Sequence, residues 1–437
     1  MEKRINVIGA GLAGCEAALQ ISARGVPVRL FDIKPKYFTP AHSNPDFCEL
    51  VCSNSLKSDL LSTAGGMLKA ELRLMKSRVL EAADSSSVPA GSALAVDRAV
   101  FAKKVDSAVK ADPLIEIVCE EVKRIPEGDV TIVATGPLTT DALAADISSK
   151  FGQNLHFYDA EAPIISGDSI DYSETFTADR YGKGESDYVN CPLTKEEYER
   201  FIKELVSAEC AERKEFEKSD VFEGCMPVEI MAKRGEDTLR FGPLRPVGFR
   251  DSAGNRPYAV VQLRRENAAG SAYNIVGFQT NLKFGEQKRV FSLIPALKNA
   301  DYLRYGVMHR NSFVNAPKTL NKGFMTKLSG VFIAGQLSGV EGYVESVASG
   351  LIAGVNAVRY VKDIPLLELP PTTITGALCD YLVRENADFQ PMNANFGILP
   401  PLNAKIRDKN AKKLAYSERG LKDLKEYINT GTEDLWK

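Results

Sequence analysis

The stretch INVIGAGLAGCEAALQISARGVPVRLFD, residues 5–32, decides the fold of this chain. An apolar run is followed by a glycine turn, a helix-prone segment and a second apolar run that ends at Asp32. This order of strand, glycine turn, helix, strand and acid is typical of a dinucleotide-binding βαβ unit. In such a unit Gly9 provides the backbone angles of the turn, Gly11 lets a pyrophosphate approach the main chain, and Gly14 lets helix and strand pack closely.

This turn is the first candidate cofactor site. The N-terminus of the following helix offers unpaired N–H groups and a positive dipole end to phosphates, and Asp32 is placed to accept a hydrogen bond from a ribose hydroxyl. A purely structural glycine turn is the alternative, but strand, helix and distal acid all favour nucleotide binding. We therefore expect cofactor contacts from Gly9, Ala10, Gly11, Leu12, Ala13, Gly14 and Asp32.

A second glycine-rich segment favours FAD over NAD as the bound dinucleotide. The apolar run 331–334 leads through two glycine turns into a small-residue helix over 344–358. Two distant turns that build one site suit an extended flavin dinucleotide, and Glu16, just after the first turn, also favours a flavoprotein. The second segment is expected to contribute Gly335, Gly339, Glu341, Gly342 and Tyr343.

Composition limits the class of protein. With 437 residues and 44% hydrophobic content, the chain is long enough for two or three domains. No apolar run approaches the roughly 20 residues that span a bilayer, so we expect a soluble, cytoplasmic protein without membrane contacts. The eight cysteines are scattered and expected to be reduced. Cys48 and Cys52 lack a second pair or a histidine cluster, so we expect no metal site.

The pattern along the chain predicts an interrupted flavin domain. Short alternating stretches broken by Gly, Pro and Asn begin near residue 151, with one charged helix near 195–218, and the strand pattern of the flavin domain returns at 331. We predict an α/β protein in which a Rossmann-like FAD-binding domain is interrupted by an inserted α+β domain on the substrate side and followed by a helical C-terminal tail. The predicted limits are 1–150 and 321–365 for the FAD-binding domain, 151–320 for the insertion and 366–437 for the tail.

Charge is segregated along the chain although the net charge is only −2. Residues 231–310 carry 14 Lys/Arg and 6 Asp/Glu, and residues 401–425 carry 8 and 3. Such segregation indicates a phosphate backbone as partner, although most basic stretches are merely solvated faces. The leading RNA contacts expected from the first segment are Lys233, Arg234, Arg264, Arg265, Lys288 and Arg289.

Two cysteines differ from the other six in their settings. Cys52 lies in the polar loop 49–57 with small hydroxyl residues and a lysine, and Cys225 lies between Gly224 and the bend at Pro227. Nearby cations lower the pKa of a thiol toward the reactive thiolate, and a flanking glycine permits close approach of a substrate. The alternative is that both are small buried hydrophobic residues.

Over essentially its whole length the chain resembles the folate- and FAD-dependent tRNA (uracil-5-)-methyltransferases of bacteria. Matching blocks include residues 7–14, 49–56, 222–229, 305–311 and 339–346. The resemblance implies that Cys225 is the nucleophile that adds to uracil C6 and that Cys52 helps to remove the C5 proton. It also implies FAD as cofactor, 5,10-methylenetetrahydrofolate as one-carbon donor, NAD(P)H as reductant and the T arm of tRNA as substrate, with no obligate protein partner.

Some features depart from this family or leave alternatives open. Asn281 stands where many relatives have a histidine, which puts an imidazole contact to the folate in doubt, and Cys48 is an extra thiol without an assigned role. Tyr343 is expected either to stack on a pterin or simply to pack. The same chemistry on 23S ribosomal RNA, an FAD oxidoreductase with a small-molecule substrate and a non-catalytic RNA-binding flavoprotein are the rival functions. Methylation from S-adenosylmethionine would leave the second glycine turn unexplained.

Overall fold

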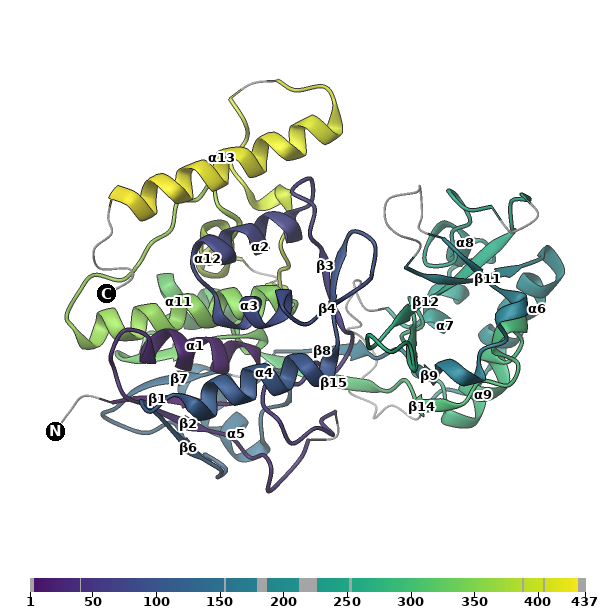
Figure 1. Cartoon of the computed structure of the whole chain (residues 1–437). Helices are drawn as coiled ribbons and strands as arrows, with labels where there is room; N and C mark the ends of the chain where they lie inside the picture. The colour runs from purple at the N-terminus through teal and green to yellow at the C-terminus, as the bar shows by residue number, and fades with distance from the viewer. Residues whose placement is uncertain are drawn as a thin grey trace.

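A computed structural model describes residues 4–39, 41–152, 155–178, 187–211, 226–250, 254–386, 389–403 and 405–430. Figure 1 shows a larger body, with the N-terminal sheet below several helices, and a smaller body beside it. The C-terminal helix α13 (Lys409–Thr430) lies on the larger body. Among the described residues, no helix combines the length and apolar character needed to cross a membrane.

A five-stranded parallel sheet forms the centre of the larger body. Its order is β16-β7-β1-β2-β6, with β1 paired to β2 on one side and to β7 on the other. Because β16 lies beside β7 at this edge, both glycine turns follow strands of one sheet and emerge at its carboxyl end. The strands are β1 (Ile5–Ile8), β2 (Val28–Phe31), β6 (Ile115–Val118), β7 (Val130–Val133) and β16 (Val331–Ile333).

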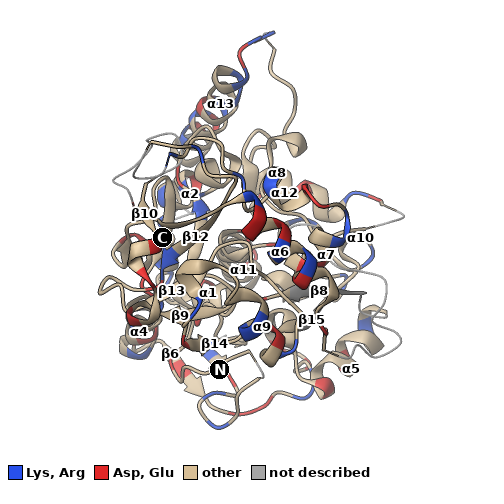
Figure 2. Cartoon of the chain, turned by 90° about the vertical axis from the view of Figure 1, so that its right-hand side faces the viewer, with Lys and Arg blue, Asp and Glu red and all other residues tan. Residues whose placement is uncertain are grey.

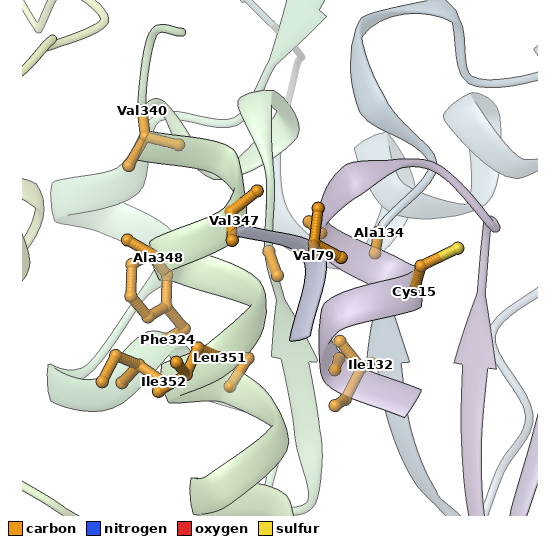
Figure 3. Packing of buried hydrophobic residues seen from close by; sticks show 14 of the residues in the cluster. Cys15, Val79, Ile132, Ala134, Phe324, Val340, Val347, Ala348, Leu351 and Ile352 are labelled. Atoms are coloured by element: carbon orange, nitrogen blue, oxygen red, sulfur yellow. The ribbon is translucent and has the colours of Figure 1, made fainter. Parts of the chain in front are cut away.

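Two helices that follow the glycine turns pack tightly on each other. These are α1 (Leu12–Ser22) and α11 (Tyr343–Val361), so the predicted small-residue helix over 344–358 is confirmed. A Cβ on Gly350 would lie 2.2 Å from Ala13 O, so glycine is what lets the two backbones approach. In Figure 3, Val347, Ala348, Leu351 and Ile352 project from α11 among the buried residues that join the helices to the sheet.

Buried carboxylates cap other helices of the larger body. Glu71 accepts hydrogen bonds from the backbone N–H groups of Ile374 (2.7 Å) and Thr375 (2.9 Å) at the start of α12, and burial raises the pKa of Glu71 to about 7.

The remaining helices of the larger body are α2 (Ala64–Leu74), α3 (Arg78–Asp84), α4 (Arg98–Ala111), α5 (Asp141–Phe151), α10 (Ala316–Thr319) and α12 (Ile374–Val383). A small antiparallel sheet adds β3 (Ser55–Ser58), β4 (Ser87–Val88) and β5 (Ala93–Val96).

The smaller body is built on a six-stranded antiparallel sheet of order β10-β11-β12-β13-β9-β14. Its strands are β9 (Ile164–Ser166), β10 (Phe176–Thr177), β11 (Val189–Leu193), β12 (Ala259–Arg265), β13 (Ala272–Ile275) and β14 (Tyr302–Arg304). The helices are α6 (Lys195–Ser207), α7 (Val228–Lys233), α8 (Thr238–Phe241) and α9 (Phe284–Phe291). A separate ribbon of β8 (Leu155–Ala160) and β15 (Met308–Phe313) lies between the bodies in Figure 1.

The predicted fold class is confirmed. A Rossmann-like sheet is interrupted in sequence by an α+β body and completed by β16 and α11, and helices follow. The predicted charged helix near 195–218 is shorter, because α6 ends at Ser207 and residues 212–218 lie outside the described residues. The exact domain limits stay a prediction.

Candidate functional site

The three glycines of the first turn have different local roles. Gly9 has a φ of +101°, and a Cβ there would lie 2.6 Å from Ala134 O. A Cβ on Gly14 would lie 1.7 Å from Gly9 O, so this glycine is required for the contact of α1 with the turn. Gly11 differs, because a Cβ there would meet no described atom within 4 Å. The protein itself does not need a glycine at residue 11, and the open space in front of it is available to a ligand.

Both glycine turns line one cleft. Its empty volume is about 1180 Å³ with the open solvent at its entrance included, large enough for an extended ligand. The cleft thus joins the start of α1 to the turn after β16, as two turns around one dinucleotide require. Of the predicted cofactor residues, those that line it are Gly9, Ala10, Gly11, Leu12, Ala13, Asp32, Gly335 and Tyr343.

Asp32 has a structural task besides its predicted one. Its Oδ2 accepts a hydrogen bond from Ala10 N at 2.6 Å, and its Oδ1 accepts one from Lys34 N at 2.8 Å. The carboxylate therefore ties the end of β2 to the glycine turn. Each carboxylate oxygen can accept a second hydrogen bond, so contact with a ribose hydroxyl stays compatible with this geometry.

Four predicted cofactor residues do not line the cleft. Besides Gly14, these are Gly339, Glu341 and Gly342. A Cβ on Gly339 would lie 2.6 Å from the ring of Phe389, and one on Gly342 would lie 2.2 Å from the carboxylate of Glu345. Glu341 accepts a hydrogen bond from Gln336 Nε2 at 2.7 Å. These residues support the second turn through packing and hydrogen bonds, and their contact with a cofactor stays a prediction, as it does for Gly335 and Tyr343.

Tyr343 connects the second turn to the loop of Cys52. Its hydroxyl oxygen accepts hydrogen bonds from Cys52 N at 2.7 Å and from Ser53 N at 3.1 Å. Burial raises the pKa of this phenol, which therefore stays protonated. Cys52 itself is half-buried, and its neighbour Val51 lines the cleft together with Tyr343. The predicted second functional cysteine is thus held beside the predicted cofactor site.

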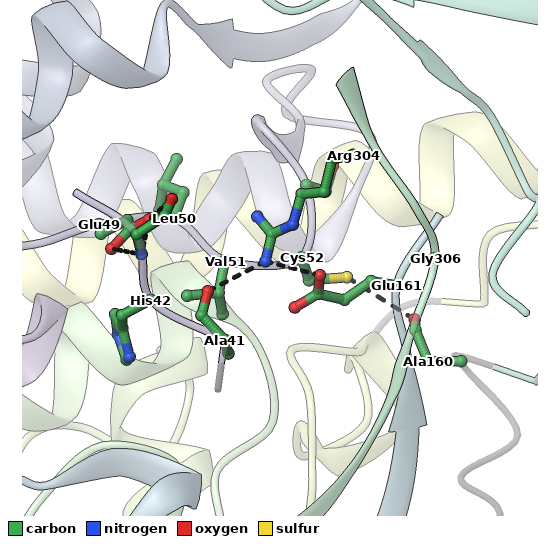
Figure 4. A network of polar contacts seen from close by, with 12 residues as sticks. Ala41, His42, Glu49, Leu50, Val51, Cys52, Ala160, Glu161, Arg304 and Gly306 are labelled. Atoms are coloured by element: carbon green, nitrogen blue, oxygen red, sulfur yellow. Dashed lines mark hydrogen bonds and ion pairs between the residues drawn. The ribbon is translucent and has the colours of Figure 1, made fainter. Parts of the chain in front are cut away.

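A polar network that sequence reasoning missed surrounds this loop (Figure 4). Arg304 donates to Ala41 O at 3.0 Å and forms an ion pair with the buried Glu161 at 2.8 Å. Cys52 Sγ lies 4.0 Å from Ala160 O. Nearby, burial and the charge of Lys34 lower the pKa of His42, so its imidazole is neutral at physiological pH. No local feature of the sequence indicated this network, because its members come from segments far apart in the chain.

Cys225 lies outside the described residues, but both chain ends that flank it are anchored to one segment. Before the gap, Ala211 N donates to Asn281 O at 2.8 Å. After it, Val228 N donates to Gln279 O at 2.7 Å. Asn281 is 7% exposed, and its backbone N–H donates to Glu229 Oε1 at 2.9 Å. Asn281 therefore serves this anchor, whatever its bearing on folate.

Cys48 belongs to the packing of the first glycine turn. Its backbone N–H donates to Ala10 O at 2.9 Å, and Cys15 Sγ lies 3.2 Å from the same oxygen. Burial raises the pKa of the Cys15 thiol well above its ordinary value. These contacts tie the start of the Cys52 loop to the turn, and they assign no chemical role to Cys48.

Some of the predicted RNA contacts are exposed side chains, whereas others are buried or already form ion pairs within the protein. Lys233, Arg234 and Lys288 are exposed, and Arg265 is half-buried. Arg289 is exposed but pairs with Glu204 and Glu286, and Figure 2 shows the corresponding mixture of charges on α6 and α9. Arg264 is 7% exposed. The prediction of Arg264 as a surface contact for phosphate is therefore wrong, because its guanidinium is enclosed by the Cys52 loop.

Comparisons with known proteins agree with this geometry. A family profile described as "Glucose inhibited division protein A" matches residues 4–365. Among solved structures, GidA of Aquifex aeolicus superposes with a TM-score of 0.71 in one crystal form, at 16% identity, covering 100% of this chain and 74% of that one. A second crystal form gives a TM-score of 0.70 at 17% identity, with 98% and 79% covered. At these identities the likeness shows the fold.

Sequence relatives are much closer. The methylenetetrahydrofolate–tRNA-(uracil-5-)-methyltransferase TrmFO of Acetivibrio thermocellus is 54% identical over 429 residues, 97% of this chain and 98% of its own length. The protein of the same name from Caldicellulosiruptor bescii is 54% identical over 430 residues, with 97% and 99% covered. At this identity and coverage, the chain belongs to the family of the methylenetetrahydrofolate–tRNA-(uracil-5-)-methyltransferases, within the wider glucose inhibited division protein A group.

Proposed function

We propose that this protein methylates C5 of a uridine in tRNA, with FAD as cofactor and 5,10-methylenetetrahydrofolate as one-carbon donor. The observation that carries the proposal is the cleft lined by both glycine turns, beside which Tyr343 holds the Cys52 loop. The names of the 54% identical relatives support the reaction and the RNA. The finer proposals are the T loop as target, NAD(P)H as reductant, a cytoplasmic location and action without an obligate protein partner.

The residues of the cleft fit an FAD molecule. Gly11 faces open space where a pyrophosphate would lie, and the first turn of α1 presents N–H groups that have no acceptor within the helix. Gly335, with a φ of +72°, also lines the cleft and lies next to the first turn, since a Cβ there would lie 3.1 Å from Ala13 Cβ. When bound, FAD supplies the electrons that reduce the transferred carbon to a methyl group.

The two cysteines divide the remaining chemistry. Uracil C5 is a weak nucleophile until a thiolate adds at C6, and we assign that addition to Cys225. We assign to Cys52 the removal of the C5 proton after the carbon has been transferred. The target base has to leave its stack, because neither thiol can reach the ring of a base inside a packed helix.

The reaction can be tested with purified components. Unmodified tRNA transcripts incubated with the protein, FAD, methylenetetrahydrofolate and NADPH should gain 5-methyluridine, which is detected by mass spectrometry of digested nucleosides. A transcript with cytidine at the T-loop target should gain none. Methylation of a 23S ribosomal RNA fragment alone would replace tRNA by the rival substrate. Flavin turnover without any methylated RNA would favour a small-molecule oxidoreductase.

We further propose that RNA binds to two exposed basic surfaces. The first is carried by the exposed Lys233, Arg234 and Lys288 of the smaller body, with the half-buried Arg265 as a fourth cation of that body. The other, at the start of α13, consists of five exposed cations that form no ion pair with described residues: Lys405, Arg407, Lys409, Lys412 and Lys413. Farther along, Ser417 and Leu424 anchor α13 to the larger body, which leaves the basic end at the surface (Figure 2).

Salt dependence tests these surfaces. Neutralising the five cations at the start of α13 should reduce the slope of log K against log salt by about 0.7 to 0.9 for each phosphate that the variant no longer binds. Filter binding of tRNA across a salt series measures the slope. Arg289→Gln is the matched control. The guanidinium of Arg289 already forms ion pairs with Glu204 and Glu286, so its removal should leave the slope unchanged. An unaltered slope in the five-site variant would identify this surface as a solvated face.

A further inference from the structure

An arginine of the larger body holds one side of the Cys52 loop. Arg98, at the start of α4, donates from Nη1 to Leu50 O at 2.8 Å and to Val51 O at 3.4 Å. Its Nη2 donates to Cys52 O at 3.4 Å. The same guanidinium forms an ion pair with Glu266, which follows β12 in the smaller body. One side chain of the larger body therefore binds three successive carbonyl groups of the loop and also forms an ion pair with the smaller body.

An arginine of the smaller body holds the other side of the loop. Arg264, on β12, donates from Nη2 to Ser53 Oγ at 2.7 Å and from Nε to Asn54 Oδ1 at 2.8 Å. Asn54 is fully buried and donates in turn to Val96 O at 3.0 Å and to Arg265 O at 2.8 Å. The backbone and side chains of the Cys52 loop are thus hydrogen-bonded from both bodies.

The charges of this arrangement do not balance. Glu266 is the partner of Arg98, whereas Arg264 forms no ion pair with a carboxylate in the part of the chain that the structure describes. Two guanidinium groups and one carboxylate leave one net positive charge at a site where Arg264 and Glu266 are nearly fully buried. A buried charge is costly unless it is paired. A thiolate on Cys52 would supply the missing negative charge.

The electrostatic couplings point the same way. Burial lowers the pKa of Arg264, while the charges of Glu266 and Cys52 act to raise it. Burial also acts to lower the pKa of Arg98, but Glu266, Tyr343 and Cys52 outweigh it, and that pKa is raised. Coupling between two ionisable groups is mutual, so each guanidinium favours the ionised form of the thiol.

Three other ionisable groups near Cys52 in the described part of the chain, Tyr343, Glu161 and Arg304, leave this balance unchanged. Tyr343 contributes a protonated phenol. Glu161 and Arg304, on the side of Ala160, form an ion pair with each other and so add no net charge (Figure 4). The excess positive charge next to the loop therefore comes from Arg98 and Arg264.

We propose that Arg98 and Arg264 are positioning residues that hold Cys52 as a thiolate beside the cleft. The use of that thiolate to accept the C5 proton rests on the proposed function, whereas the ionisation of the thiol does not. Because Arg264 and Glu266 belong to the smaller body, the state of the thiol also depends on the contact between the two bodies.

The pH dependence of Cys52 alkylation tests whether Arg98 and Arg264 hold the thiol in its ionised form. The FAD-bound protein is treated with iodoacetamide across a pH series, and modification of the Cys52 peptide is followed by mass spectrometry. The wild-type midpoint should lie below the ordinary thiol pKa of about 8.5. Arg98→Met and Arg264→Met should each raise it by about one pH unit, which slows alkylation at neutral pH about tenfold. Arg98→Lys and Arg264→Lys keep the charge and should restore most of the shift.

Glu266→Gln separates electrostatics from damage to the fold. It removes the carboxylate that neutralises Arg98, so the midpoint should move downward, opposite to the arginine variants. Arg73→Met is the matched control, because Arg73 pairs with Asp59 and Asp84 on the surface and should leave the midpoint of Cys52 unchanged. Cys119 is half-exposed and provides an internal reference thiol.

Each outcome decides the proposal. Arginine-to-methionine variants that keep FAD and the wild-type midpoint would overturn it. If those variants lose FAD, Glu266→Gln decides, and an unchanged or raised midpoint of Cys52 alkylation in that variant would overturn the proposal. If all midpoints shift as expected but the protein cannot methylate RNA, the roles of Arg98 and Arg264 are supported and only the proposed function is rejected.

Discussion

Cys52→Ala should lose methylation but still form a covalent adduct with RNA that carries 5-fluorouridine at the target position. The thiol acts after nucleophilic attack, and fluorine at C5 cannot leave as a proton does, so the adduct persists. Loss of a positioned proton acceptor should lower the rate of methylation about 10² to 10⁴-fold. Gel shift under denaturing conditions measures the adduct, and nucleoside analysis measures the methylation.

Cys225→Ala provides the reciprocal result. Without the nucleophile, neither adduct nor 5-methyluridine should form. Both variants should keep FAD, because neither thiol belongs to a glycine turn. An adduct that persists in Cys225→Ala and vanishes in Cys52→Ala would reverse the two roles. Full methylation by both variants would show that the thiols are merely structural and would remove the thiol mechanism.

Gly11→Val and Gly14→Ala should fail for different reasons. The larger side chain at Gly11 enters open space in the protein but blocks the path of a pyrophosphate, so this variant should fold and lose FAD. The added methyl group at Gly14 would meet Gly9 O at 1.7 Å, so this variant should lose stability, with a drop of about 4–5 kcal/mol or more in the free energy of unfolding. The visible flavin absorbance and thermal unfolding of each purified protein measure the two effects.

Gly285→Val is the control for this pair. Gly285 lies in α9, and a Cβ there also meets no described atom within 4 Å, so a valine should disturb neither folding nor flavin content. Wild-type protein should be yellow. A Gly11→Val variant that retains full flavin absorbance would remove this turn from the cofactor site, and a Gly14→Ala variant of wild-type stability would contradict the packing described for α1.

The local pattern of the sequence was sufficient for the first βαβ unit. Strand, glycine turn and helix are decided by residues that are neighbours in the chain, and Gly9 and Gly14 occupy the conformation and the close contact that their spacing predicts. The second turn followed from the same local signals. The packing role of Gly339 could not be predicted from the sequence, because its neighbour Phe389 lies about 50 residues later in the chain and reaches Gly339 only in the folded protein.

The burial and pairing of the basic residues could not be predicted from the sequence. Arg264 and Arg289 look alike in a count of charges, yet one is enclosed beside Ser53 and the other is exposed and paired with Glu204. Burial of a guanidinium depends on partners that arrive from distant parts of the chain, and local composition carries no information about them. Arg98 likewise showed no local sign that it would bind the carbonyl groups of the Cys52 loop.

By itself, the sequence determined the Rossmann-like core, the two glycine turns, the interruption by an α+β body and the family. These properties depend on periodicity, on glycine conformation and on motifs that are contiguous in the chain. Only the tertiary structure decided that Tyr343, Arg98 and Arg264 converge on the loop of Cys52. The physical reason is that hydrogen bonds and charge pairing between segments remote in sequence exist only once the chain has folded and these segments have packed together.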